Sequence, residues 1–196
     1  MSFFSLNFSK KPRRLFVAIG LGLATIVSTS AIGYVKTTSL DATIIGTKDL
    51  PISSTVVIDK VFVDKSDRIL QLLSGDTVVK SYRIALGDNP VGHKQQQGDE
   101  RTPVGVYTLD YKNENSIAHR SIHISYPNAV DKARAQSRGL NPGGDIMIHG
   151  QMNGFGHLAW INQRRDWTDG CIAVTDSEMD EIMEAVKVGT AIEIVE

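Results

Sequence analysis

Short stretches of alternating apolar and polar residues, separated by turns, dominate the chain from residue 55 onward. Residues 55–63, 68–73 and 77–86 each follow this period of two, and Ser, Asp and Gly residues separate them. Val and Ile occupy many of the apolar positions, as they do in strands that are buried on one face. The pattern predicts an antiparallel meander that ends at the Gly-Asp-Asn-Pro turn over residues 87–90.

The rest of the chain combines short strands with helices. Thr175 and Glu178 have the spacing of a capping box before a stripe of Met and Ile residues, and Gly189 ends that helix. Ala and charged residues predict another helix over residues 128–138. Apolar segments predict strands at 104–111, 121–125, 146–148, 172–174 and 191–195. The sequence therefore predicts a mainly β domain with a few helices over residues 55–196.

The charge balance excludes one class of partner. The chain has 21 Lys+Arg against 22 Asp+Glu, so it carries no basic field that would attract nucleic acid. Its five His are scattered without the spacing of metal ligands, and there is no CxxC motif. We expect neither a nucleic-acid partner nor a metal ion or other cofactor.

The N-terminal third has a different composition. Residues 1–14 are a basic n-region, and residues 15–35 are an apolar run long enough to span a membrane. This run is interpreted either as a membrane anchor or as a signal peptide that is cleaved near the small residues 28–31. Because the basic side stays in the cytoplasm, either outcome exports the domain. The polar residues 36–54 form a linker to the domain at 55–196.

Cys171 is the only cysteine, so it cannot form an intrachain disulfide. It is interpreted either as a small buried apolar residue or as a nucleophile, which requires a nearby base because a free thiol is mostly protonated at neutral pH. His149 follows the predicted strand 146–148, and the intervening chain can return to a neighbouring strand. An imidazole facing the thiol would take its proton and pass it to a leaving amine.

The residue before the cysteine suits acyl chemistry. Gly170 can adopt a positive φ and leaves room for a carbonyl group beside the turn. The backbone amides of Asp169, Gly170 and Cys171 are therefore candidates for an oxyanion hole, which stabilises the charge that develops on an attacked carbonyl.

Four further residues are candidates for substrate binding. His123 lies on the predicted strand 121–125, and Gly150 directly follows His149. Arg164 and Arg165 could hold a substrate carboxylate, because the planar guanidinium pairs with it through two hydrogen bonds. The alternative to substrate binding is a structural role: His123 would form hydrogen bonds within the fold, and Arg164 and Arg165 would be solvated surface residues.

Several motifs together resemble one known family. Ile-His-Gly at 148–150, followed by Thr-Asp-Gly-Cys-Ile at 168–172, resembles the signature of the L,D-transpeptidase catalytic domain (YkuD). Gly-Asp-Asn-Pro-Val-Gly at 87–92 and Gly-Asp-Glu-Arg-Thr-Pro-Val-Gly at 98–105 resemble its glycine-rich segments. The resemblance covers about residues 54–196.

The resemblance implies a β-sandwich-like mixed sheet and a cell-wall enzyme of the bacterial periplasm. Cys171 would attack a meso-diaminopimelate carbonyl of a peptidoglycan tetrapeptide, and His149 would transfer protons. D-alanine would leave, and an amine of another stem peptide or of a wall-linked lipoprotein would resolve the thioester. Water as the acceptor would make the same site a hydrolase. A catalytically inactive wall-binding module is the third hypothesis.

The sequence departs from the common family pattern at two positions. Asp169 replaces a second histidine, and Ala173 replaces an arginine or asparagine. The interval between His149 and Cys171 is also longer than in the commonest members. The TDGC form resembles a subgroup that includes an enzyme detaching lipoprotein from peptidoglycan. An acidic residue beside the nucleophile disfavours the thiolate, unless Asp169 orients His149 or pairs with a nearby arginine.

Overall fold

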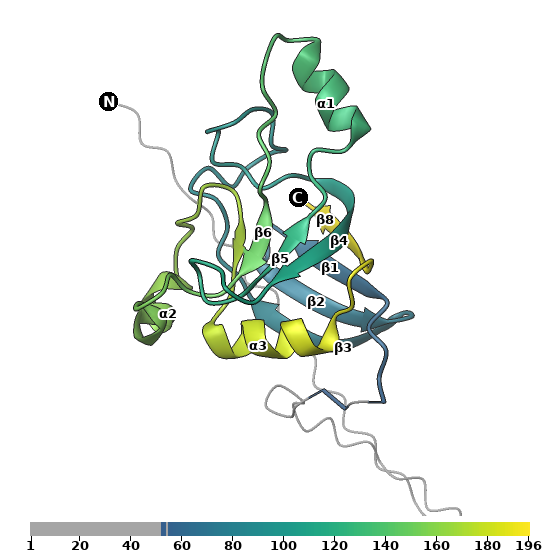
Figure 1. Cartoon of the computed structure of the whole chain (residues 1–196), viewed down its shortest axis with the longest axis vertical. Coiled ribbons are helices and arrows are strands. Elements are labelled where there is room, and N and C mark those ends of the chain that lie inside the picture. Colours follow the sequence, from purple (N-terminus) through teal and green to yellow (C-terminus); the bar gives the residue numbers. More distant parts are fainter. Residues whose placement is uncertain (1–51, 54) are drawn as a thin grey trace, which may run out of the picture. The chain divides into compact units, whose positions relative to one another are not determined.

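The computed structural model describes residues 52, 53 and 55–196 of the chain. Strands β1 (Lys60–Asp64), β2 (Ile69–Ser74) and β3 (Thr77–Arg83) form the predicted antiparallel meander (Figure 1). The predicted segments 1–14 and 15–35 and nearly all of the predicted linker lie outside the described residues. Among the residues that are described, no helix is both long and apolar enough to cross a membrane.

The first strand begins five residues later than the alternation indicates. The sequence predicts a strand from Thr55, but β1 starts at Lys60. Its parallel partner begins opposite Lys60, at Ala191, so the preceding residues have no strand to pair with on that side. The alternating pattern of the sequence therefore extends into residues before Lys60 that lack a complete ladder of hydrogen bonds.

The other predicted strands and helices are present. The structure adds a 3₁₀ turn, η2 (Gly156–Leu158), and a single helical turn, α2 (Ala159–Asn162), neither of which the sequence pattern predicts. The elements after the meander are β4 (Gly105–Asn113), β5 (Ser121–Ile124), α1 (Ala129–Gln136), β6 (Met147–His149), α2 (Ala159–Asn162), β7 (Ile172–Ala173), α3 (Asp176–Ala185) and β8 (Ala191–Val195).

The eight strands form one mixed sheet in the order β3-β2-β1-β8-β4-β5-β6-β7. The pairs β1–β8 and β6–β7 are parallel, and the other neighbours are antiparallel. Ala85, just after β3, pairs with Ala173 of β7 through two hydrogen bonds of 2.9 and 2.8 Å. The sheet thus curls until its two ends meet, which confirms the predicted β-sandwich-like mixed sheet.

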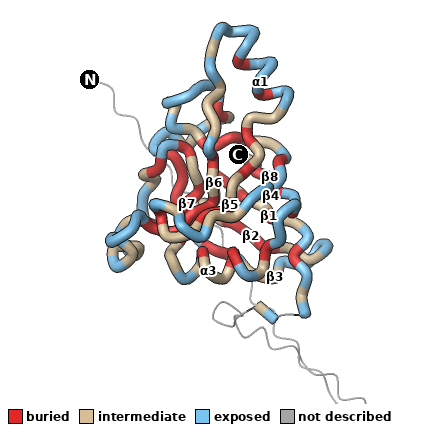
Figure 2. Tube along the Cα trace, in the orientation of Figure 1, coloured by how far each residue is buried: buried red, intermediate tan, exposed pale blue. Residues whose placement is uncertain are grey.

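The core lies inside this curled sheet, where Figure 2 shows the buried residues gathered. One face of every strand contributes apolar side chains to it, as the period of two requires. Helix α3 adds Met179, Ile182 and Met183, and its N-terminus has the predicted capping box between Thr175 and Glu178. Fully buried strand residues include Val61, Val63, Leu70, Leu72, Leu109, Ile122, Ile124, Ile148, Ile172, Ile192 and Ile194.

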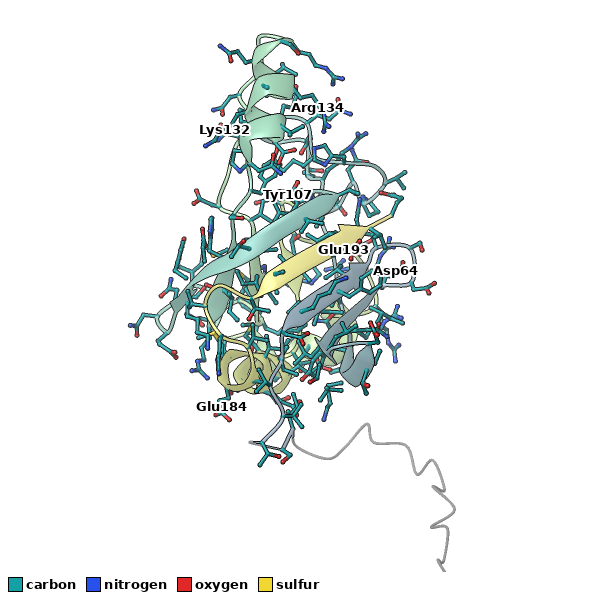
Figure 3. The ribbon with its side chains drawn as sticks, turned by 90° about the vertical axis from the view of Figure 1, so that its right-hand side faces the viewer. Asp64, Tyr107, Lys132, Arg134, Glu184 and Glu193 are labelled. Carbon is teal, nitrogen blue, oxygen red and sulfur yellow. The ribbon has the colours of Figure 1, made fainter. Side chains whose placement is uncertain are left out.

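The excursion between β5 and β6 carries α1 away from the sheet (Figure 1). Its exposed face carries Lys132 and Arg134, which Figure 3 shows beyond the end of the sheet. At the base of the helix, Tyr107 donates a hydrogen bond of 3.1 Å to Asp131. The loop before β4 meets this excursion, because the Gln97 amide donates to the Asn141 carbonyl at 2.8 Å.

Candidate active site

His149 and Cys171 lie on the same face of neighbouring strands. In the parallel pair β6–β7, Ile148 is opposite Ile172, and both point into the core. His149 is opposite Ala173 and therefore points to the other face. Cys171 directly precedes Ile172, so it lies two register positions from the partner of His149. The fold thus brings together residues from two distant segments.

The hydrogen bond of His149 determines its tautomer. Nδ1 lies 2.6 Å from the Gly150 carbonyl oxygen. Because a carbonyl can only accept, Nδ1 carries the proton, and the lone pair of the neutral ring is on Nε2. Burial lowers the pKa of His149, although the bond to Gly150 acts in the opposite direction. The ring also meets Trp167 edge-on, with 5.8 Å between centroids. A neutral ring of this kind can accept a proton.

Gly150, predicted to contact substrate, is buried. A Cβ atom added to it would lie 2.7 Å from Oδ1 of Asp176 and 2.8 Å from Cβ of His119. The position therefore tolerates only glycine. The carbonyl of Gly150 accepts the hydrogen bond from Nδ1 of His149. Asp176, at the start of α3, and His119 cover this side of Gly150, and its contact with substrate stays a prediction.

The thiol of Cys171 is held near the start of β6. Its Sγ donates to the Asp145 carbonyl at 3.5 Å, and it makes no hydrogen bond with His149. Burial raises the pKa of Cys171, a hydrogen bond from the Met147 amide lowers it, and the charge of Asp169 raises it. Asp145 itself has a φ of 56°, a conformation that is uncommon outside glycine. The resting thiol is therefore protonated at neutral pH.

Thr168 fixes the turn that leads to the thiol. Its Oγ1 donates to the Cys171 carbonyl at 2.7 Å and accepts from the Gly170 amide at 3.2 Å. The Gly170 amide, predicted as an oxyanion donor, is thus engaged within the turn. Among the described residues, the amides of Asp169 and Cys171 have no acceptor. These two donors remain available beside the thiol.

Gly170 is required by both conformation and space. Its φ is 121°, and a Cβ atom there would lie 2.6 Å from the Arg101 carbonyl oxygen. Gly87 approaches the same place, since its Cβ would lie 2.0 Å from the Glu100 carbonyl oxygen and 2.9 Å from Cα of Gly170. The Asp88 amide donates to the Thr168 carbonyl at 3.0 Å. The two glycine-rich motifs of the sequence therefore pack against the turn before Cys171 and position it.

His123 lies on the same face as the thiol. It is the register partner of Met147, whose backbone amide lowers the pKa of Cys171. Its Nδ1 lies 2.6 Å from a carboxylate oxygen of Asp110, and its ring stacks on Tyr111 with 4.6 Å between centroids. These contacts hold the ring at the border of the site.

Three predicted residues make fewer contacts than expected. Arg164 is exposed and stacks over Trp160 at 5.4 Å. In the described part of the chain, the side chains of Arg165 and Asp169 form no hydrogen bond or ion pair. Asp169 thus neither orients His149 nor pairs with either arginine, so its charge acts only to disfavour the thiolate.

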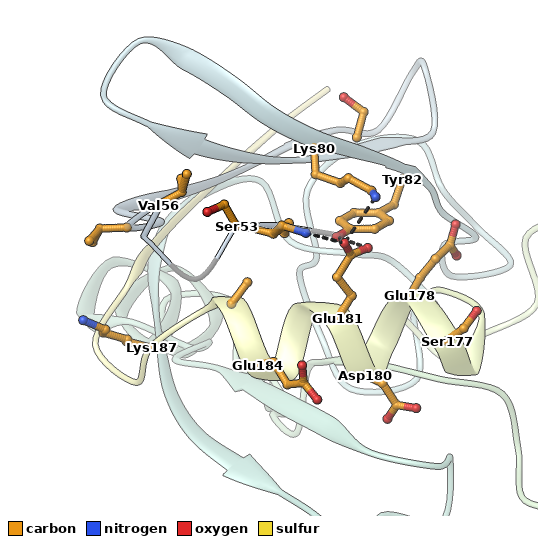
Figure 4. A pocket seen from close by; sticks show the side chains of 14 residues that line it. Ser53, Val56, Lys80, Tyr82, Ser177, Glu178, Asp180, Glu181, Glu184 and Lys187 are labelled. Atoms are coloured by element: carbon orange, nitrogen blue, oxygen red, sulfur yellow. Dashed lines mark hydrogen bonds and ion pairs between the residues drawn. The ribbon is translucent and has the colours of Figure 1, made fainter. Parts of the chain in front are cut away.

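A cavity of about 780 Å³ lies away from the thiol, between α3, β3 and residues 52, 53, 56 and 57 (Figure 4). Glu181 dominates it, accepting from Tyr82 Oη at 3.0 Å and pairing with Lys80 at 3.2 Å. Its lining contains no cysteine or histidine. The cavity therefore offers no thiol and no imidazole base.

Trp167, Thr168 and Asp145 were not recognised from the sequence as parts of the site. Trp167 and Thr168 belong to the same run as Cys171, which was the available signal. Asp145 acts through its carbonyl group and a left-handed backbone, and its side chain gave no indication of either.

Comparison with known proteins identifies the fold family. The family model of YkuD, the L,D-transpeptidase catalytic domain, matches residues 58–194. The chain belongs to this family. The match spans β1 to β7 and β8 as far as Ile194, and it contains both His149 and Cys171.

Individual relatives of this YkuD domain are longer than the chain. A candidate L,D-transpeptidase of Escherichia coli (strain K12), YafK, is 30% identical over 112 residues, which are 56% of this chain and 37% of YafK. The helical cell shape determining protein Pgp2 of Campylobacter jejuni is 26% identical, with a TM-score of 0.55. That alignment covers 77% of this chain and 52% of Pgp2. The chain thus spans about half or less of these proteins.

Bd1075 of Bdellovibrio bacteriovorus shares the fold. Its TM-score is 0.50 at 20% identity, over 74% of this chain and 53% of Bd1075. The curled mixed sheet of this YkuD domain therefore recurs in a protein with little sequence similarity to it.

Proposed function

We propose that the domain is a cysteine-dependent acyltransferase that acts on the peptides of the bacterial cell wall. One observation carries this proposal: a buried, neutral imidazole with its lone pair on Nε2 lies on the same sheet face as the single thiol. Membership of the YkuD family and the similarity to YafK and Pgp2 support the cell-wall substrate.

In the proposed first half-reaction, Sγ of Cys171 attacks the carbonyl carbon of a meso-diaminopimelate residue. The thiol proton passes to Nε2 of His149, and the carbonyl oxygen becomes an oxyanion. The amides of Asp169 and Cys171 would donate to this oxygen, and each such donor is worth about 3 kcal/mol in enzymes where it has been removed. The C–N bond then breaks, His149 returns the proton to the nitrogen of D-alanine, and a thioester remains on Cys171.

In the second half-reaction an amine attacks the thioester, and the thiol leaves. The acceptor would be an amino group of another stem peptide or of a wall-linked lipoprotein. Water in the same place would give a carboxylate, so the enzyme would act as a hydrolase. The TDGC run resembles that of an enzyme that detaches lipoprotein, and this resemblance supports hydrolysis as the alternative outcome.

Intact-mass measurement of the protein with a disaccharide tetrapeptide tests the proposal. We expect a mass increase equal to the substrate minus D-alanine, free D-alanine in solution, and neither with Cys171→Ala. Adding an amine acceptor separates transfer, which forms a new amide, from hydrolysis, which forms a tripeptide end. If the folded wild-type protein forms no adduct and releases no D-alanine, the domain is an inactive binding module.

We also propose a periplasmic location, with residues 15–35 as an anchor or a cleaved signal. Fractionation of cells that produce the full chain, followed by N-terminal sequencing of the product, tests both points. Recovery in the cytoplasmic fraction with an intact N-terminus would contradict them.

A further inference from the structure

A second cavity, of about 300 Å³, lies beside the segment that leads to the thiol. Four arginines line it, and we call it the arginine pocket. They come from the start of β2, the end of β3 and the segment before β7. Its lining consists of Ser66, Arg68, Arg83, Ile84, Gln163, Arg164, Arg165 and Asp166.

The positive charge of the arginine pocket is only partly neutralised. Asp166 is the one carboxylate in the lining, and Arg68 already holds it, with Nη2 at 2.7 Å and Nε at 3.1 Å from its oxygens. Arg83 donates from Nε to the Gln163 carbonyl at 3.1 Å, which orients its guanidinium without neutralising it. Arg165 has no side-chain partner among the described residues. Three guanidinium charges therefore face no carboxylate.

Gln163 brings two unpartnered polar atoms to the arginine pocket. The residue is 8% exposed, and neither its Nε2 nor its Oε1 atom has a hydrogen-bond partner in the described structure. A buried carboxamide without partners costs free energy, so such groups are rare in folded proteins unless something binds them. A ligand with both acceptor and donor atoms, such as a peptide, would satisfy it.

The arginine pocket includes a residue, Arg83, on the sheet face that carries the thiol. Arg83 lies two residues before Ala85, which pairs with Ala173, the register partner of His149. Alternation along a strand places all of these on one face of the sheet. Asp166, in the lining, directly precedes Trp167, whose ring contacts His149. A peptide could therefore reach both places at once.

We propose that the arginine pocket binds a carboxylate of the peptide whose acyl group Cys171 attacks. Guanidinium groups pair with carboxylates through two parallel hydrogen bonds, which gives both orientation and charge recognition. Arg83 and Arg165 make these contacts, and the Gln163 carboxamide bonds the adjacent peptide group. This inference rests on the proposed function, because it takes the cell-wall tetrapeptide as the ligand.

Binding to the inactive Cys171→Ala protein tests the arginine pocket without turnover. Calorimetric titrations would use a disaccharide tetrapeptide and three derivatives, each with a different carboxylate converted to an amide. We expect Arg83→Gln and Arg165→Gln each to weaken binding of the unmodified tetrapeptide about tenfold or more, the usual effect of losing a hydrogen bond to a charged group. Lys132→Gln, which removes an exposed charge on α1, is the matched control and should leave the affinity unchanged.

The amide derivatives identify the contact by a double-mutant cycle. The derivative that lacks the recognised carboxylate should bind the Cys171→Ala protein more weakly than the tetrapeptide does. Its affinity should fall no further when Arg83→Gln or Arg165→Gln is added to that protein. Equal losses for every derivative in every protein would overturn the proposal. Inorganic phosphate that competes with the amidated derivatives as well as with the tetrapeptide would overturn it too, because it would show a general anion site. If the wild type releases D-alanine but either of these results is found, the proposed function stands and only the proposal for the arginine pocket fails.

Discussion

The carbonyl oxygen of Gly150 accepts the Nδ1 proton of His149 at 2.6 Å, so a backbone group decides which ring nitrogen can take a proton. The same glycine lies against Asp176 at the start of α3 and leaves no room for a side chain. The start of α3 therefore packs against the residue whose carbonyl selects the tautomer that the proposed acyl transfer requires.

Replacing the imidazole should slow the first half-reaction. We expect His149→Gln to reduce D-alanine release from a disaccharide tetrapeptide by about 10² to 10⁴, the usual contribution of a general base. His157→Gln is the control, because His157 is exposed and outside the site. Equal rates for the two variants, with both folded by circular dichroism, would contradict the assigned role of His149.

The rate of thiol alkylation should rise to a higher pH at Cys171 than at an ordinary cysteine. Burial is the main cause of the raised pKa of Cys171, and Asp169 adds to it, while the Met147 amide and Lys94 oppose it. Alkylation by iodoacetamide, followed by intact mass, should therefore still accelerate above pH 9, the ordinary value for this group. Neutralising a nearby negative charge lowers a thiol pKa, so Asp169→Asn should move the profile to lower pH. A shift to higher pH would be the wrong sign.

Gly170 should resist substitution more strongly than other glycines with positive φ. Gly154→Ala costs only the backbone conformation, about 1–2 kcal/mol, because φ is 87° and nothing lies within 4 Å of the new Cβ. Gly170→Ala adds a Cβ atom 2.6 Å from the Arg101 carbonyl oxygen, so its loss in unfolding free energy should be clearly larger. Chemical denaturation of both variants gives the comparison, and a smaller loss at Gly170 would refute the close packing.

The hydroxyl of Thr168 should matter for both stability and rate. Thr168→Val leaves the Gly170 amide without its acceptor and the Cys171 carbonyl without its donor, which should cost about 1–3 kcal/mol of unfolding free energy. D-alanine release should fall as the turn loosens. Thr168→Ser keeps the hydroxyl and should restore most of both losses; failure to do so would mean that the methyl group, and not the hydrogen bonds, is what the site needs.

Local patterns were enough to predict most of the fold. The capping box of Thr175 and Glu178 and the alternation over β2 and β3 depend only on neighbouring residues, and both were recognised correctly. The parallel pairing of β1 with β8 determines where β1 begins, and it joins segments more than 120 residues apart in the chain. Local sequence patterns do not reveal so distant a partner, so the predicted start of β1 is too early.

Local patterns also predict part of the candidate site. His149 and Cys171 were recognised because each belongs to a short motif. The grouping of Arg165 with Arg68 and Arg83 was not: the β2–β3 pairing places Arg68 beside Arg83, but Arg165 belongs to a distant segment that reaches them only because the sheet curls. The role of Thr168 was also missed, since a threonine in a turn is common and its two hydrogen bonds depend on the exact backbone path.

Strand β8 closes the curled sheet. This strand lies between β1 and β4 and is the last of the eight described strands to be synthesised. The pairing of β6 with β7, which brings His149 and Cys171 onto one face, involves no residue of β8. Until residues 191–195 have emerged from the ribosome, however, β1 and β4 have no strand between them, so a nascent or shortened chain that lacks β8 carries both candidate catalytic residues on an unclosed sheet.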